Sequence, residues 1–303
     1  MLFMAGVRKL GLGLVQMAAG PDAVQNFNRA IEFVEQAARG GAALVCLPEL
    51  FRSQYFCQRE DAKAFDLAET VPGPTTAALG EVARRYSITI IAPVFERRAP
   101  GIYHNSAAMI GPAGEIVGLY RKMHIPDDPA YYEKYYFTPG DLGFPTFETP
   151  AGRFATLICW DQWFPEAARL ATLEGAVVLF YPTAIGWHPE EKEVFGRGQR
   201  DAWRTIQRAH AIANAVYVVA VNRVGLEKLP DAGPGIEFWG SSFVADPFGV
   251  ILAEAAPNRE EMLMVEIDLD RVEEVRRNWP FLRDRRVDAY AGLNRRLLDE
   301  KLK

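Results

Sequence analysis

Three residues that could perform acyl-transfer chemistry each follow an apolar, strand-like run. Glu49 follows ALVCLP, Lys122 follows a run that ends near Tyr120, and Cys159 follows FATLI. A thiol can act as a nucleophile, a carboxylate as a general base, and an ammonium group can stabilise a developing oxyanion. Strand ends are where open α/β proteins usually bind ligands, so these three side chains are predicted to converge on one cleft.

The position of Cys159 favours a reactive thiol. The residue lies where a predicted strand passes into a helix that begins near Pro165. The helix N-terminus and the backbone N–H groups after the cysteine favour negative charge, on a thiolate as well as on an oxyanion. The alternative is a small buried packing residue. Likewise, an isolated glutamate or lysine at a strand end can be a turn cap or a solvated side chain.

Composition argues against several other classes of function. The chain has 303 residues, of which 49 % are hydrophobic and 24 % charged, and its formal net charge is −5. This is typical of a globular protein without the basic surface that nucleic-acid binding requires. The chain contains no apolar run of about 18 residues, the length that a membrane-spanning helix requires. The N-terminus lacks the pattern of a signal peptide.

The cysteines and histidines do not form metal-binding or disulfide patterns. Cys46, Cys57 and Cys159 contain no CxxC pair, and the four histidines contain no HExxH pattern. An odd, sparse cysteine count is typical of a reducing compartment, so we expect a cytoplasmic protein. We expect no metal site and no organic cofactor.

Strand and helix patterns alternate along the chain, which predicts a mixed α/β protein. Strands are expected at residues 9–17, 43–50, 88–95, 105–110, 116–120, 154–159, 177–181, 216–221 and 262–269, helices at 22–39, 74–86, 165–174 and 199–214, and a hairpin at 238–254. No linker divides the chain, so we predict one domain over residues 1–303, with 272–303 as a C-terminal arm. The GLGLVQ stretch lacks the helix that a dinucleotide site requires.

Long motifs around the reactive residues resemble those of a known family. LPEL at Glu49, YRKMHIP at Lys122 and ICWDQWFPEAARL at Cys159 are similar to the three signatures of the nitrilase superfamily of carbon–nitrogen hydrolases. YFCQ, EKYYF, LFYPTAIG and NRVG further resemble the N-carbamoylputrescine amidase branch. The resemblance covers roughly residues 9–290 and implies an αββα sandwich, with two mixed sheets packed face to face and helices outside.

The resemblance also implies a role for each reactive residue. Glu49 would be the general base and Cys159 the nucleophile. Lys122 would stabilise the oxyanion together with the backbone N–H of Trp160. Glu133, in YYEKYYF, would orient Lys122 or the attacking water. No metal or organic cofactor is implied, and the family typically forms homo-oligomers, as dimers or larger assemblies.

The implied reaction is hydrolysis of the carbamoyl C–N bond of an N-carbamoyl amine, with N-carbamoylputrescine as the best candidate. Substrate-binding residues are expected to be Tyr55, Tyr131, Trp160 and His188. His188 stands where the branch typically carries an acid that would pair with an ammonium group. Glu190 or Glu191 could replace that acid, or the substrate could be N-carbamoyl-β-alanine or another N-carbamoyl amino acid.

Other activities remain as alternatives at this stage. A nitrilase or an aliphatic amidase would use the same three groups on a different substrate. A papain-like protease would pair the cysteine with a histidine such as His124 or His210. A catalytically silent interaction protein could share the fold, although Glu49, Lys122, Cys159 and Glu133 together argue against it.

Overall fold

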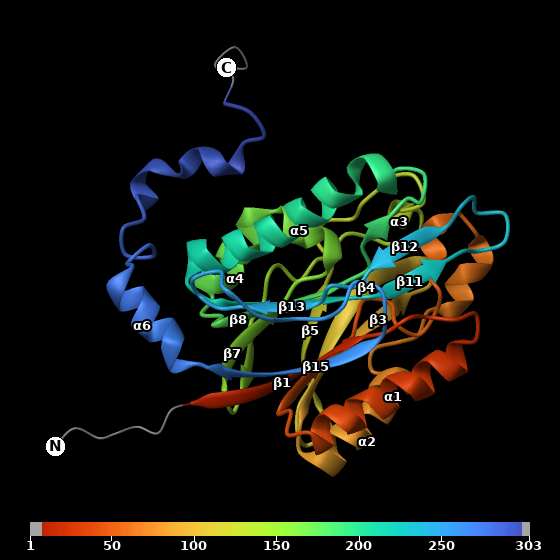
Figure 1. Cartoon of the computed structure of the whole chain (residues 1–303), viewed down its shortest axis with the longest axis horizontal. Helices are drawn as coiled ribbons and strands as arrows, with labels where there is room; N and C mark the ends of the chain where they lie inside the picture. The colour runs from red at the N-terminus through yellow and green to blue at the C-terminus, as the bar shows by residue number, and fades with distance from the viewer. Residues whose placement is uncertain (1–7, 299–303) are drawn as a thin grey trace.

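Two six-stranded β-sheets form the centre of the molecule (Figure 1). The computed structural model describes residues 8–298. The first sheet, in the order β15-β1-β2-β3-β4-β5, contains β1 (Lys9–Gln16), β2 (Leu44–Cys46), β3 (Thr89–Ala99), β4 (Ile102–Ile110), β5 (Ile116–Arg121) and β15 (Glu261–Asp268). The second, in the order β14-β13-β10-β8-β7-β6, contains β6 (Phe147–Thr149), β7 (Gly152–Thr156), β8 (Val178–Thr183), β10 (Tyr217–Asn222), β13 (Phe243–Ala245) and β14 (Ile251–Glu254).

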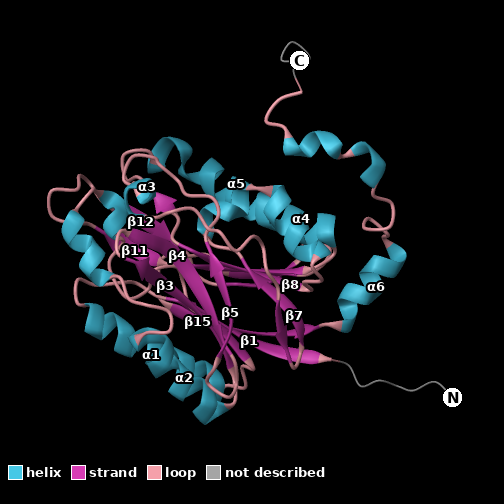
Figure 2. Ribbon diagram, turned by 180° about the vertical axis from the view of Figure 1, so that it is seen from behind, coloured by secondary structure: helices cyan, strands magenta, loops and turns pink. Residues whose placement is uncertain are grey.

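Helices cover the outer face of each sheet. The helices are α1 (Ala23–Arg39), α2 (Pro74–Tyr86), α3 (Glu133–Tyr136), α4 (Pro165–Leu173), α5 (Lys192–Asn214) and α6 (Asp270–Asn278). Helices α1 and α2 pack on the first sheet, and α4 and α5 lie on the far side of the second (Figure 2). The predicted αββα sandwich is therefore confirmed.

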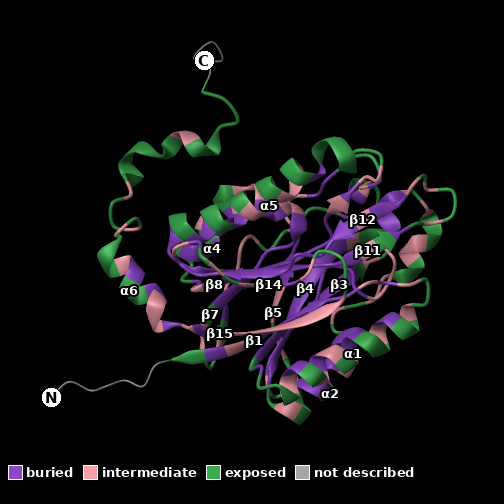
Figure 3. Ribbon diagram, viewed as in Figure 1, coloured by how far each residue is buried: buried purple, intermediate pink, exposed green. Residues whose placement is uncertain are grey.

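The alternation of side chains along the strands explains why the sheets pack in this way. In β1, Leu12 and Leu14 belong to the core between the two sheets, whereas Val15 belongs to the core beneath α1 and α2. Successive residues of a strand point to opposite faces, so a strand buried on both sides is apolar throughout. Figure 3 shows the resulting buried strands between more exposed helices. Gly13 lies in β1, where a Cβ atom would come within 2.8 Å of the Ala37 Cβ in α1. This close approach accounts for the glycine at this position.

A small third sheet closes one end of the sandwich beside the candidate site. It contains β9 (Gly186–Trp187), β11 (Val224–Glu227) and β12 (Ile236–Trp239), in the order β11-β12-β9. The hairpin expected over residues 238–254 is correct for β13 and β14, but residues 238–239 belong to β12, which pairs with β11 instead. Gly240 and Ser241, both with positive φ, separate the two strands.

Several further boundaries differ from the prediction. The strand expected over residues 43–50 ends at Cys46, and the strand expected over residues 88–95 continues to Ala99. The strand expected to reach Cys159 ends at Thr156, because the chain turns into a 3₁₀ helix over Cys159–Trp163. Helix α5 begins at Lys192, seven residues before the predicted start, although Gly196 and Gly198 are weak helix formers. Gly196 packs against Trp187, whose Nε1 lies 2.9 Å from the position of a Cβ and donates a hydrogen bond to the Gly196 carbonyl. Tertiary contact therefore overrides the local preference.

Residues 126–150, where the sequence analysis expected neither helix nor strand, contain the short helix α3 and strand β6, and α3 begins with Glu133. Remaining short 3₁₀ helices are Phe56–Gln58, Ala62–Leu67, Val287–Ala289 and Ala291–Asn294. None of the helices within residues 8–298 is long and apolar enough to cross a membrane.

Candidate active site

Lys122 lies between two buried carboxylates. Its Nζ is 2.9 Å from Glu49 Oε1 and 2.6 Å from Glu133 Oε2, and all three residues have an exposed fraction of 0 %. Lys122 follows β5, Glu49 lies in the turn after β2, and Glu133 begins α3. In the chain, Lys122 is 73 residues from Glu49 and 11 residues from Glu133, so the fold brings the three groups together.

The two oxygens of Glu49 have different surroundings. Oε1 accepts hydrogen bonds from Lys122 Nζ and from Asn105 Nδ2, at 2.9 and 2.7 Å. Oε2 is buried and has no nitrogen or oxygen donor among the described residues, and hydrogen bonding with the Cys159 thiol acts to lower the Glu49 pKa. A buried carboxylate oxygen without a donor is costly, and such groups are concentrated at functional sites. Oε2 is therefore the oxygen available to accept a proton.

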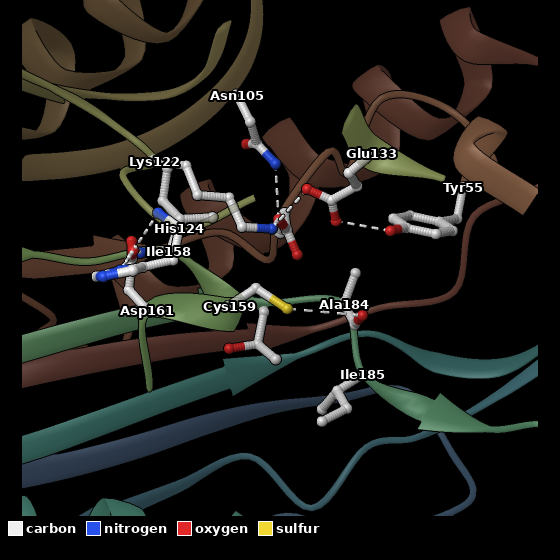
Figure 4. A network of polar contacts seen from close by, with 12 residues as sticks. Tyr55, Asn105, Lys122, His124, Glu133, Ile158, Cys159, Asp161, Ala184 and Ile185 are labelled. Atoms are coloured by element: carbon white, nitrogen blue, oxygen red, sulfur yellow. Dashed lines mark hydrogen bonds and ion pairs between the residues drawn. The ribbon is translucent and has the colours of Figure 1, made fainter. Parts of the chain in front are cut away.

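Cys159 presents its sulfur to this cluster from the opposite sheet. Figure 4 shows Sγ between Ala184 and the Lys122–Glu133 pair. The thiol donates to the Ala184 carbonyl oxygen at 3.8 Å, and the residue is 4 % exposed. Its φ of 43° is in the left-handed region, which costs a non-glycine residue about 1–2 kcal/mol and is concentrated at active sites.

Asp161 holds the turn that carries Cys159. Its Oδ2 accepts hydrogen bonds from the Ile158 backbone N–H at 2.9 Å and from the Tyr120 hydroxyl at 2.7 Å. Its Oδ1 lies 2.7 Å from the Nδ1 of His124. Tyr120 and His124 flank Lys122 in sequence, so Asp161 ties the cysteine turn to the strand end that presents the lysine. The sequence analysis assigned no role to Asp161, because Tyr120 and His124, which it contacts, are 41 and 37 residues away in the chain.

Charge and burial together set the acid–base properties of the cluster. Burial raises the pKa of Glu49, Lys122 opposes this effect, and the negative charge of Glu133 adds to it. Burial would lower the pKa of Lys122, but the two carboxylates outweigh that effect and raise it well above its usual range. Burial also raises the pKa of Cys159 well above that of an ordinary thiol. The resting sulfur is therefore a neutral thiol that needs a base to become nucleophilic.

A cavity of about 440 Å³ opens beside Cys159. Three of the predicted substrate-binding residues line it: Tyr131, Trp160 and His188. The fourth, Tyr55, lies behind the cluster instead. It is fully buried, and its hydroxyl donates to Glu133 Oε1 at 2.6 Å (Figure 4). Tyr55 thus orients a carboxylate.

Two acidic side chains also lie at the cavity. The sequence analysis did not name Asp128, and it named Glu191 only as a possible replacement for the acid that His188 displaces. Asp128 and Glu191 both line the cavity, and both are exposed. Asp128 lies in the PDDP stretch, whose charge pattern alone resembles any solvated loop. Among the described lining residues there is no lysine or arginine. The charged groups around the cavity therefore favour a cationic ligand.

The histidines that could have served a Cys–His pair are engaged elsewhere. His124 Nδ1 contacts Asp161, and the ring stacks on Phe164 with 3.7 Å between centroids. His210 Nε2 lies 2.7 Å from the Gln162 carbonyl oxygen. The charged groups that act on the pKa of Cys159 are Glu49, Lys122 and Glu133.

Comparisons with known proteins agree with this arrangement. The carbon–nitrogen hydrolase family model matches residues 11–277. The chain is 42 % identical over 289 residues to an N-carbamoylputrescine amidase of Solanum lycopersicum, covering 94 % of this chain and 95 % of the relative. It is 38 % identical over 286 residues to a citrullinase of Francisella tularensis, covering 94 % and 98 %.

A solved structure with a higher sequence identity than these relatives shares the fold. The crystal structure of a carbon–nitrogen hydrolase from Helicobacter pylori G27 superposes with a TM-score of 0.92 and is 47 % identical, covering 96 % of this chain and 100 % of that one. The family match spans both sheets and every residue of the cluster. The chain therefore belongs to the carbon–nitrogen hydrolase family, the nitrilase superfamily, within the branch similar to N-carbamoylputrescine amidases.

Proposed function

We propose that the protein hydrolyses the carbamoyl C–N bond of an N-carbamoyl amine with a cationic tail, N-carbamoylputrescine being the best candidate. The observation that supports this most directly is the Glu49–Lys122–Cys159 cluster beside a cavity whose charged lining residues are Asp128 and Glu191. The relative named as an N-carbamoylputrescine amidase also supports it. Products would be the amine, CO₂ and ammonia.

In the first half-reaction, Glu49 Oε2 takes the thiol proton as Cys159 Sγ attacks the carbamoyl carbon. The S–C bond forms, and the oxyanion is stabilised by Lys122 and by the backbone N–H of Trp160. Glu49 then returns its proton to the leaving nitrogen, and ammonia departs. The remaining adduct is a carbamoyl thioester on Cys159.

In the second half-reaction, Glu49 takes a proton from water, which attacks the thioester carbon. The C–S bond breaks, the thiol regains a proton, and a carbamic acid leaves. That acid decomposes to CO₂ and the free amine. One carboxylate performs both proton transfers, which requires a pKa nearer to neutrality than an ordinary glutamate has. Burial raises the pKa of Glu49, which is the direction that this role requires.

Glu133→Gln is expected to shift the acid limb of the pH profile of kcat/KM to lower pH. The negative charge of Glu133 raises the pKa of Glu49, so its removal leaves Lys122 to lower that pKa. Base catalysis by Glu49 then begins at lower pH. Initial rates measured over a pH series give the shift. Glu237→Gln, which removes an exposed carboxylate paired with Lys192, should leave the profile unchanged. An acid limb that stays or moves to higher pH would contradict the coupling.

Ammonia release from a matched panel of substrates tests the proposed function. We expect kcat/KM for N-carbamoylputrescine to exceed that for butylurea, its uncharged counterpart, by about tenfold. Two partly screened carboxylates contribute about 1–1.5 kcal/mol to binding the ammonium group. Asp128→Asn and Glu191→Gln should each raise KM for the cationic substrate and leave that for butylurea unchanged.

The same panel separates the alternatives. Preference for N-carbamoyl-β-alanine would contradict the proposal that the substrate has a cationic tail. It would also make His188 the residue to mutate. Citrulline belongs in the panel because a relative is named as a citrullinase. Ammonia release from nitriles or simple amides only would identify a nitrilase or an aliphatic amidase. If the purified protein released ammonia from no member of the panel, the hydrolase assignment would be rejected.

We further propose that residues 1–303 form one domain that associates into a homo-oligomer through the C-terminal arm. Val272 and Val275 of α6 are buried, and beyond α6 the chain continues as the arm seen at one side of the molecule (Figure 1), where Arg285, Tyr290 and Leu293 lie across a pocket from α4 and α5. Apolar side chains in this segment are exposed: Trp279, Val287, Leu293, Leu297 and Leu298. Such an exposed apolar segment fits contact with a second copy. Light scattering that gives the monomer mass of 33.8 kDa would reject the assembly.

We also propose a cytoplasmic location. Cys46, Cys57 and Cys159 are buried free thiols, as expected for a reducing compartment. Fractionation of cells that express the protein tests this, and recovery outside the cytoplasm would reject it.

A further inference from the structure

Arg223 and Glu227 form a buried ion pair that takes no part in the proposed reaction. Arg223 follows β10 in the NRVG motif, and Glu227 ends β11. Arg223 Nη2 lies 2.7 Å from Glu227 Oε1, and the two side chains are 1 % and 2 % exposed. Burying two charges costs several kcal/mol per ion, and their attraction often only offsets that cost. Stability alone therefore does not explain why this ion pair is buried.

The contacts of this pair converge on the chain immediately after Glu49. Arg223 Nη1 donates to the Leu50 carbonyl oxygen at 3.3 Å, and Nη2 donates to the Ser53 carbonyl oxygen at 2.6 Å. Glu227 Oε2 accepts a hydrogen bond from the backbone N–H of Tyr55 at 2.7 Å. Three main-chain groups between residues 50 and 55 are thus held by side chains 170 to 173 positions away in sequence.

The segment needs such support because it has no regular structure of its own. Strand β2 ends at Cys46, and residues 49–54 form turns and bends. Leu50, directly after Glu49, has a φ of 51°, a conformation that costs a leucine about 1–2 kcal/mol. Strained backbone persists only where surrounding contacts determine it. Arg223 binds the carbonyl group of this strained residue.

Both ends of the segment carry a member of the catalytic cluster. Glu49 at one end presents Oε2, the oxygen proposed to accept the thiol proton. Tyr55 at the other end donates its hydroxyl to Glu133, which in turn contacts Lys122 Nζ. A shift of the segment would therefore displace the base and loosen the lysine together. Displacement of about 1 Å in a catalytic group can cost about 10²-fold in rate.

We propose that Arg223 and Glu227 are positioning residues that hold the turn bearing Glu49 in its reactive geometry. This inference rests on the proposed hydrolase function. The planar guanidinium donates from Nη1 to Leu50 and from Nη2 to Ser53 while its charge pairs with Glu227, because its donors point in fixed, diverging directions. A lysine ammonium group is a compact charge that cannot span the same acceptors.

Arg223→Lys tests the geometry while keeping the charge. We expect kcat per active thiol to fall by about 10²-fold and KM to change by less than about threefold, because the cavity lining is untouched. Active thiols are counted by stoichiometric alkylation of Cys159 with iodoacetamide. The alkylation rate should also fall across the pH series, since a displaced Glu49 no longer takes up the thiol proton. A merely structural role would lower the amount of active protein but not kcat per thiol.

Arg276→Lys is the matched control. Arg276 is partly buried and also binds two main-chain carbonyl groups, those of Ala176 and Asn214, each at 3.4 Å. It lies on α6 and does not line the cavity. We expect a similar loss of thermal stability without a change in kcat per thiol. If Arg223→Lys fails to fold, Glu227→Gln decides the question, because it retains an acceptor for the Tyr55 N–H while removing the charge.

The outcomes are distinguishable. Wild-type kcat per thiol and wild-type alkylation in a folded Arg223→Lys or Glu227→Gln protein would overturn the inference while leaving the proposed function intact. A wild-type protein without hydrolase activity would instead reject the proposed function. A loss of kcat as large in Arg276→Lys would assign the effect to general destabilisation and would also overturn the inference.

Discussion

Cys159→Ala is expected to lower kcat by about 10⁴-fold or more, because Cys159 is the one thiol among the described residues that line the cavity. Cys159→Ser should be inactive as well, since Glu49 would have to take a proton from a far less acidic hydroxyl. Ammonia release by purified protein measures the loss. In the wild-type protein, mass spectrometry of a rapidly quenched reaction should detect the carbamoyl adduct on Cys159.

The fold should survive this substitution. Cys159 is nearly fully buried, and alanine removes one sulfur atom without leaving a charged group unpaired. Cys46→Ala is the matched control, because it removes a buried thiol in β2 that has no proposed role. It should keep its kcat. Turnover by Cys159→Ala at the rate of Cys46→Ala would reject the covalent mechanism.

Glu49→Gln distinguishes this mechanism from a Cys–His pair. The amide cannot accept the thiol proton, so turnover should be lost as in Cys159→Ala. His210→Gln should retain turnover, because His210 contacts the Gln162 backbone rather than the thiol. The reverse pattern would identify a histidine base.

Lys122→Met is expected to destabilise the protein by about 3–5 kcal/mol and to lower kcat by about 10³-fold. The substitution leaves Glu49 and Glu133 buried without their shared cation, and removal of one partner of a buried ion pair carries a cost of this size. Loss of oxyanion stabilisation accounts for the effect on rate. Urea unfolding measures the first quantity and initial rates the second.

The pH dependence of the Lys122→Met deficit identifies its cause. Burial already raises the pKa of Glu49, and loss of the lysine removes the main influence that lowers it. A carboxyl whose folded pKa is raised loses stability as pH rises through the interval between its unfolded and folded values. The deficit should therefore be larger at about pH 8 than at about pH 5. Lys192→Met, which removes an exposed ion pair with Glu237, should change stability by less than about 1 kcal/mol. A deficit independent of pH would reject the electrostatic explanation.

Local sequence patterns were sufficient for most of the fold. Apolar runs bounded by glycine and proline located the central strands, and helical spacing located α1, α2 and α4, because both signals come from neighbouring residues. Boundaries failed where a distant contact decided them. The start of α5 depends on Trp187 packing against Gly196, and the strand before Cys159 ends early because Asp161 holds the turn.

The sequence by itself determined which chemical groups are present at the strand ends, and a family resemblance supplied their expected roles. It could not determine that Lys122 bridges Glu49 and Glu133, that Tyr55 stands behind Glu133 rather than in the cavity, or that Arg223 reaches the turn after Glu49.

The physical reason is the range of the forces involved. Periodicity and turn chemistry act over a few residues, whereas these hydrogen bonds and ion pairs mostly join positions from 73 to 173 apart. Only the packing of the two sheets and the small third sheet against one another sets those distances. The burial of Glu49, Lys122 and Cys159, which shifts their pKa values, is likewise a property of the tertiary structure alone.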